Sequence, residues 1–173
     1  RGRKEEFVFT GPEVKVYVCG VTPYDVSHVG HAMSYVVFDV IRRYLEYKGY
    51  QVRHVQNFTD IDDKLIQRAN QQGISVGELA RRNIDAYFND MDTLNIRRAH
   101  VYPMATQEIP RIIEVISVLI TKGYAYTANG DVYFRVGRAQ GYGKLSGRSL
   151  EGMMVGSRVE ASAQKENPMD FAL

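Results

Sequence analysis

The first 58 residues alternate between strand-like and helix-like spacing of apolar positions. The run KVYVC at 15–19 is short, apolar and rich in valine, which is typical of a buried strand. From His28 to Tyr47 the spacing changes to three and four residues, which predicts an amphipathic helix that ends at Gly49. The apolar positions of this helix are Val29, Met33, Val36, Val37, Val40, Ile41, Tyr44 and Leu45.

A second strand and a second helix follow at once. QVRHVQNF at 51–58 has the strand pattern, and TDIDD at 59–63 is typical of a helix start, with Thr59 or Asp60 as the N-cap and acidic residues in the first turn. We interpret the carboxylates of this segment as helix-capping groups rather than as a Mg²⁺ site. The order strand, helix, strand, helix predicts a parallel sheet with right-handed crossovers, so the fold class is α/β.

After residue 73 the pattern changes. Residues 74–94 predict a helix with a capping-box-like start, from Ser75 to Glu78, and residues 107–122 predict another with Pro110 in its first turn. Asn129-Gly130 lies between two alternating runs, which is the strongest short-range signal of a β-hairpin. The glycine-rich stretch 142–158 predicts a loop with a short helix. We therefore expect an α+β insertion after a parallel βαβ start.

Composition narrows the classes of protein without selecting one. The chain has 173 residues, a net charge of +2 and 45% hydrophobic residues, which is ordinary for a globular domain and gives no sign of nucleic-acid binding. No run approaches the roughly 18 apolar residues of a membrane span, and no signal peptide is visible. The single cysteine excludes an internal disulfide, so we expect a cytoplasmic protein without a membrane partner.

The chemistry-bearing residues gather at the first strand–helix turn, in CGVTPYDVSHVGH at 19–31. Ligands of parallel α/β sheets bind at the carboxyl ends of the strands, and a helix N-terminus suits phosphate. His28 and His31 flank Gly30 there, and imidazoles that donate hydrogen bonds to phosphate oxygens stabilise the charge of phosphoryl or adenylyl transfer. Two plainer interpretations stay open: one histidine caps the helix, and Cys19 is a buried structural thiol.

Longer stretches of the chain resemble a known family. HVGH is similar to the HIGH signature of class I aminoacyl-tRNA synthetases, and YVCGVTPYDVSHVGHAMSYVVFDVIRRYLEYKGYQVRHVQNFTDIDDKLIQRA resembles the cysteinyl-tRNA synthetase family. GDVYF, YGKLSGRSLEGMMVGSRVE and KENPMDFAL continue the likeness in order, so it covers nearly all of the chain. The chain begins without methionine and ends abruptly, so we expect an N-terminal catalytic fragment of such a synthetase, inactive alone.

The resemblance implies an enzyme that uses ATP with Mg²⁺ to join L-cysteine to AMP and then to tRNA(Cys), and that is a monomer. It assigns His28 and His31 to catalysis, and it implies three sets of binding residues: Thr22, His28, Gly30 and His31 for ATP, Gly20 and Thr59 for cysteine, and Cys19 for Zn²⁺. The family's other zinc ligands, a second cysteine, a histidine and a glutamate, would lie beyond Leu173.

The same resemblance predicts three segments. Residues 1–94 would form the first half of the Rossmann-like catalytic domain, 95–163 a connective-peptide insertion, and 164–173 the start of the second half. Two alternatives remain. A cysteine ligase of mycothiol synthesis resembles the same family, has a similar TPYD stretch and transfers cysteine to an amino sugar instead. A non-catalytic module that binds nucleotide or RNA would need no chemistry at all.

Overall fold

The computed structural model describes residues 4–9, 11–147 and 165–173 and contains two compact units. The N-terminal unit is Glu6–Ile109, and the C-terminal unit joins Arg1–Glu5 to Pro110–Leu173. Each is described by itself. Among the described residues, no helix combines the length and the apolar character that crossing a bilayer requires.

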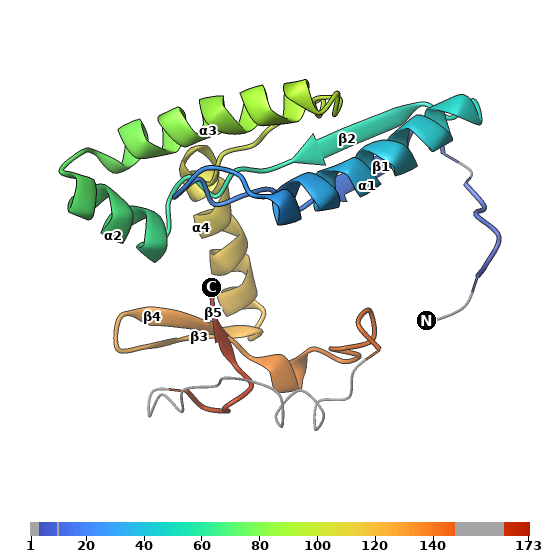
Figure 1. Ribbon diagram of the computed structural model, residues 1–173. Coiled ribbons are helices and arrows are strands. Elements are labelled where there is room, and N and C mark those ends of the chain that lie inside the picture. The colour runs from blue at the N-terminus through green and yellow to red at the C-terminus, as the bar shows by residue number, and fades with distance from the viewer. Residues whose placement is uncertain (1–3, 10, 148–164) are drawn as a thin grey trace. The chain divides into compact units, whose positions relative to one another are not determined.

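The N-terminal unit has the predicted strand–helix–strand–helix order (Figure 1). Its elements are β1 (Val14–Val18), α1 (Val29–Tyr47), β2 (Val52–Gln56), α2 (Asp63–Gln72), α3 (Val76–Thr93) and the first residues of α4 (Ala105–Thr121). The two strands pair in parallel, from Val14 opposite Val52 to Val18 opposite Gln56. The predicted α/β class and parallel pairing are therefore confirmed.

A third extended segment lies beside β2, and periodicity did not reveal it. Val55 and Phe58 form parallel bridges to Val101 and Met104. The amide of Phe58 donates to the carbonyl of Pro103 at 2.9 Å. Residues 101–104 thus extend the sheet on the side of β2 away from β1, although the run is too short for an alternating pattern to show.

The face of α1 that packs inward is not the face that we expected. The predicted apolar stripe is exposed, with Val29 at 85% and Met33 at 71%, whereas Tyr35, Asp39 and Arg42 are buried. Arg42 donates to Glu46 at 2.8 Å and, from its other end, to the carbonyl of Arg98 at 2.8 Å. A guanidinium with several partners is tolerated in the interior, because its hydrogen bonds offset the loss of water.

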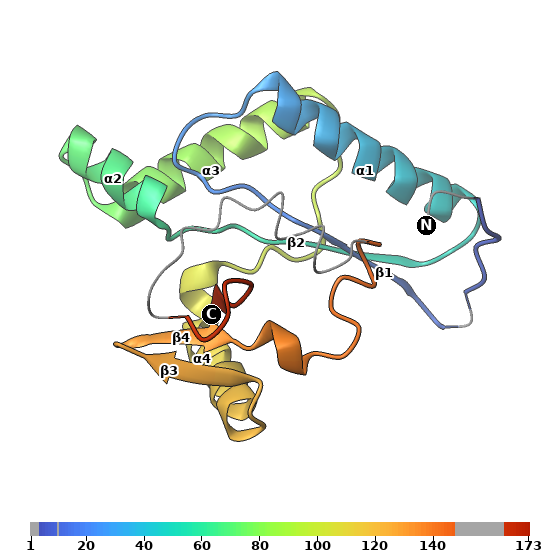
Figure 2. The ribbon, with the colours of Figure 1, turned by 90° about the horizontal axis from the view of Figure 1, so that it is seen from below.

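The core of the N-terminal unit lies between the strands and two helices. Figure 2 shows α1 and α3 on the same side of β1 and β2. Phe58 is fully buried at the centre and contacts the rings of Tyr87 and Phe88 edge-on, at 5.4 and 5.6 Å between centroids. A smaller apolar cluster joins α2 to α3, from Leu65, Ala69, Leu79 and Ala80. Large ring surfaces of this kind dominate core energetics and hold the ends of both strands in place.

Helix starts agree with the sequence at one position and differ at another. Ser75 caps α3, where its hydroxyl accepts from the amide of Glu78 at 3.2 Å, as predicted. The N-cap of α2 is Asp62 rather than Thr59 or Asp60. Asp60 accepts instead from the backbone amide of Thr106 at 2.9 Å and from its hydroxyl, so it supports the start of α4. The capping interpretation is therefore confirmed for Asp62, whereas Asp60 supports a distant helix instead.

The C-terminal unit contains the predicted hairpin. β3 (Ala125–Ala128) and β4 (Asp131–Phe134) pair antiparallel, and β5 (Phe171–Ala172) pairs antiparallel with β4. Asn129 and Gly130 have φ of 51° and 92°, as a type I′ turn requires. A short 3₁₀ turn follows at Val136–Arg138, and residues 148–158 of the predicted loop lie outside the described residues.

Pro110 lies two residues further into its helix than predicted, past the first turn. It is the sixth residue of α4, because that helix begins at Ala105 and not at residue 107.

Candidate active site

Cys19 directly follows β1, and its side chain is exposed. The interpretation of a buried structural thiol is therefore wrong. Its backbone carbonyl accepts a hydrogen bond from the Tyr35 hydroxyl at 3.3 Å. Burial, and then the nearby Cys19 thiol, raise the pKa of Tyr35 to about 12, so this hydroxyl stays protonated and remains a donor.

An accessible thiol suits a soft metal such as Zn²⁺, but a zinc site needs about four ligands. Cys19 is the only cysteine of the chain. Among the described residues, no group of three or more His, Cys, Asp or Glu side chains is placed to hold a metal. Cys19 is thus a candidate ligand, but the described residues do not form a zinc site by themselves.

His28 and His31 form a reciprocal cap at the start of α1. The Nδ1 atom of His28, which is the N-cap, accepts from the amide of Gly30 at 3.1 Å. In return, Nδ1 of His31 accepts from the amide of His28 at 3.3 Å. The two rings stack with 3.8 Å between centroids and 15° between planes. The interpretation that one histidine caps the helix is confirmed, and the second histidine completes the capping box.

This cap determines which ring nitrogens can donate. Because each Nδ1 accepts a hydrogen bond, a neutral ring carries its proton on Nε2. Burial, and then the nearby His28, lower the pKa of His31, which favours the neutral ring. The site therefore presents two adjacent Nε2–H donors in a fixed orientation.

The backbone of the helix start is less open to phosphate than the sequence suggested. The amide of Gly30 bonds to the His28 ring, and the amides of His31 and Ala32 bond to the His28 carbonyl at 2.9 and 3.2 Å. An anion at this position would thus meet imidazole N–H groups before these amides. A Cβ at Gly30 would come within 3.0 Å of the His28 ring, so glycine at this position leaves room for that ring.

Gly20 and Thr59, the residues expected in the cysteine pocket, come together at the ends of the two strands. The amide of Gly20 donates to Oδ1 of Asn57 at 2.8 Å, and Nδ2 of Asn57 donates to the Thr59 hydroxyl at 3.3 Å. The amide of Thr59 donates to the carbonyl of Val21 at 3.1 Å. These polar groups lie at the edge of the sheet where α/β proteins bind ligands.

Thr22, expected to contact ATP, lies half-buried in the loop between β1 and α1. Its carbonyl accepts from the amide of Tyr24 at 2.9 Å. The next residue, Pro23, is buried, and its carbonyl accepts from Nδ2 of the buried Asn83 on α3 at 2.9 Å. Helix α3 thereby fixes the middle of the loop that carries the candidate residues.

Sequence reasoning missed Asn57, Tyr35 and Asn83, which hold the candidate residues in place. Asn57 could have been found, because it follows the second predicted strand at the same sheet edge as Cys19 and Gly20. Tyr35 lies off the stripe that the helix pattern selected. Asn83 meets Pro23 from 60 positions away along the chain, and no local signal marks it.

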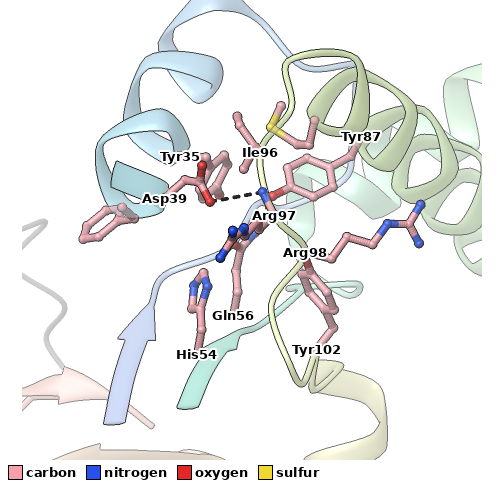
Figure 3. A pocket seen from close by; sticks show the side chains of 11 residues that line it. Tyr35, Asp39, His54, Gln56, Tyr87, Ile96, Arg97, Arg98 and Tyr102 are labelled. Atoms are coloured by element: carbon pink, nitrogen blue, oxygen red, sulfur yellow. Dashed lines mark hydrogen bonds between the residues drawn. The ribbon is translucent and has the colours of Figure 1, made fainter. Parts of the chain in front are cut away.

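The described residues of the N-terminal unit line hollows of different size. An open one of about 310 Å³ borders Ser27 and His28 and is closed on its other side by the end of α3, at Asp90 and Thr93. That volume is at the lower end of small-molecule sites. Another, between α1, β2 and α3, measures about 10 Å³, which is room for one water molecule and for no substrate (Figure 3).

The smaller cavity contains an unusual histidine. His54, on β2, is 5% exposed, and neither of its ring nitrogens has a partner among the described residues. Burial, with Arg42 and His100 nearby, lowers the pKa of His54 below its usual 6.5. In contrast, His100 bonds through Nδ1 to the amide of His54 at 2.9 Å and contacts Arg42 through Nε2 at 3.1 Å. The lowered pKa favours the neutral ring of His54, and His100 links the backbone of β2 to Arg42.

We expect the free energy of unfolding to fall as the pH drops below 6.5. In that range the unfolded chain binds a proton at His54 and the folded chain does not. The free energy of unfolding therefore falls by at most about 1.4 kcal/mol per pH unit, down to the folded-state pKa. His54→Leu should remove this part of the slope and leave stability at pH 8 unchanged or higher. Urea unfolding of both proteins between pH 5 and 8 measures it, and equal slopes would contradict this account.

Comparison with known proteins places these observations in context. The family described as "tRNA synthetases class I (C) catalytic domain" matches residues 7–173. A cysteine–tRNA ligase of Dehalococcoides mccartyi strain BAV1 is 60% identical over 173 residues, which are 99% of this chain and 38% of that protein. A cysteine–tRNA ligase of Syntrophobacter fumaroxidans is 53% identical over 171 residues, 98% of this chain and 35% of that protein. The chain thus spans little more than a third of these relatives.

Solved structures support the fold. The methionyl-tRNA synthetase of Mycobacterium tuberculosis, in complex with methionyl-adenylate, superposes with a TM-score of 0.67 at 20% identity, over 79% of this chain and 34% of that one. At this identity the likeness concerns the fold alone.

Proposed function

Because the chain belongs to the family of class I (C) tRNA synthetase catalytic domains, we propose that it supplies the ATP-binding and cysteine-binding first part of a cysteine–tRNA ligase. The relatives named for this activity, at 53–60% identity over nearly the whole chain, support the choice of cysteine. The observation that carries the chemistry is the stacked pair of His28 and His31.

In the proposed reaction a carboxylate oxygen of cysteine attacks the α-phosphorus of ATP. A bond forms between that oxygen and phosphorus, and the bond to the bridging oxygen breaks, so pyrophosphate leaves with the electron pair. Negative charge builds up on the phosphate oxygens in the transition state. Two fixed Nε2–H donors, on His28 and His31, would stabilise this charge without having to reorient. Thr22 and Gly30 complete the proposed ATP contacts.

The amino acid would bind at the strand ends, against Gly20 and Thr59. Cys19 would be one ligand of a zinc ion that holds the substrate thiol, and thiolate ligands suit Zn²⁺. Because no group of three or more His, Cys, Asp or Glu side chains is placed for a metal among the described residues, the remaining ligands would come from elsewhere in the polypeptide. Mg²⁺ would arrive with ATP.

We also propose segment boundaries at 94 and 163, transfer to tRNA(Cys), a monomeric state and a cytoplasmic location. These proposals rest on the resemblance and on the composition. The boundary at 94 would assign the extended segment 101–104 to the insertion. This segment pairs with β2 and belongs to the compact unit Glu6–Ile109.

Pyrophosphate exchange tests the proposed function. The natural polypeptide that carries these 173 residues should catalyse ATP–pyrophosphate exchange that depends on cysteine, with serine and methionine as control amino acids. It should then transfer cysteine to tRNA(Cys) and not to an amino sugar. Transfer to the sugar alone would instead support the ligase of mycothiol synthesis, and nucleotide binding without any exchange would support the non-catalytic module.

A further inference from the structure

Asn57 lies where the parallel ladder of β1 and β2 ends. The last paired residues are Val18 and Gln56. Beyond them, the amide of Gly20 bonds to the Asn57 side chain at 2.8 Å, and the hydroxyl of Tyr17 donates to the same oxygen at 3.1 Å. One side-chain amide thus connects the two strands where they separate.

The other end of the same amide sets the direction of a hydroxyl. Nδ2 of Asn57 donates to Oγ1 of Thr59 at 3.3 Å. Nδ2 can only donate, so the Thr59 oxygen accepts and its own proton stays free for another partner. On a free amino acid at neutral pH, the carboxylate accepts hydrogen bonds and the ammonium group does not. The Thr59 proton is therefore available to an acceptor such as this carboxylate.

We propose that Asn57 is a positioning residue of the amino-acid pocket, which holds Gly20 and Thr59 at a fixed separation and directs the Thr59 hydroxyl to the carboxylate of the substrate. This inference rests on the proposed function, since it takes Gly20 and Thr59 as the residues that meet cysteine. Asn57 acts through them, and its own polar side-chain atoms are engaged by Gly20, Tyr17 and Thr59.

Asn57→Asp tests the proposal with almost no change of shape. The new carboxylate still accepts from Gly20, but it cannot donate to Thr59, whose hydroxyl would turn to donate to it instead. In the natural polypeptide we expect the KM for cysteine in pyrophosphate exchange to rise about tenfold, as for a lost hydrogen bond to a charged group. The KM for ATP and kcat should each change less than about threefold, because uniform binding of one substrate is lost.

Two comparisons separate this role from added charge and from a general loss of folding. Asn70→Asp adds the same charge on the exposed side of α2 and should leave both KM values unchanged. In a Thr59→Val background, where the hydroxyl is already absent, Asn57→Asp should raise the KM for cysteine less than about twofold, because residues that act through one contact are not additive. Melting temperatures identify any unfolded variant. Asn57→Ser is uncharged and too short to span both partners, so it should also raise the KM for cysteine.

The outcomes are distinct. A selective rise in the KM for cysteine that disappears in the Thr59→Val background supports the positioning role. An unchanged KM in Asn57→Asp and Asn57→Ser, or an equal rise in both backgrounds, overturns it and leaves the proposed function intact. A wild-type polypeptide without cysteine-dependent exchange overturns the proposed function and the pocket together.

Discussion

Gly20→Ala is expected to lower the free energy of unfolding by about 3 kcal/mol or more. An ideal Cβ on Gly20 would lie 1.5 Å from the backbone carbonyl oxygen of Asn57 and 2.6 Å from its carbon. The obstacle is backbone at the end of β2, so no side-chain rotation relieves it, and the two strand ends must move apart. Inserting a methyl group into packed structure costs about 1–3 kcal/mol, and more where the backbone must shift. Urea unfolding measures the loss.

Gly77→Ala is the matched control for this substitution. Gly77 lies in the first turn of α3, and a Cβ there would meet nothing within 4 Å. Alanine restricts the unfolded chain and favours the helix, so this variant should gain about 0.5–1 kcal/mol. Changes of opposite sign in the free energy of unfolding would show that the close approach of Gly20 to Asn57 causes the loss. A loss below about 0.5 kcal/mol for Gly20→Ala would contradict this explanation.

Elements with local signals could be predicted from the sequence. The hairpin is encoded by two neighbouring residues, Asn129 and Gly130, which adopt positive φ, and α3 is marked by its Ser75 cap. The histidine pair belongs to the same class, because a cap joins residues three positions apart. Such features depend on the neighbouring chain, so the sequence contains all the information they need.

Features made by distant partners could not be predicted in this way. The apolar stripe of α1 shows that the helix has two faces, but burial of Arg42 depends on Arg98 and His100, 56 and 58 positions away. Asp60 was expected to start α2 and instead supports α4 through Thr106, 46 positions away. The link from Gly20 to Asn57 spans 37 positions. Periodicity along the sequence predicts where a helix or strand lies. Which distant residue a side chain bonds to depends on how those helices and strands pack.

His28→Asn should reduce cysteine-dependent pyrophosphate exchange about 10²–10³-fold, which is the typical effect of removing one donor to transition-state charge. The oxygen of an asparagine side chain can replace Nδ1, which accepts from Gly30, and asparagine is among the best N-cap residues. Nothing in asparagine reaches the position of Nε2. The variant should therefore fold with a free energy of unfolding within about 0.5 kcal/mol of the wild type while losing the donor.

His28→Gln is the complementary variant. Its longer amide can place an N–H near the position of Nε2, but glutamine is a poor N-cap, so the start of α1 should lose about 1 kcal/mol. If the pair stabilises phosphate charge through Nε2, asparagine gives the stable and inactive protein and glutamine the less stable and more active one. The two variants should therefore rank in opposite order by activity and by stability. Exchange rates and urea unfolding of both variants in the natural polypeptide measure this. Full activity of His28→Asn would show that His28 only caps the helix, since the cap is the one function that asparagine preserves.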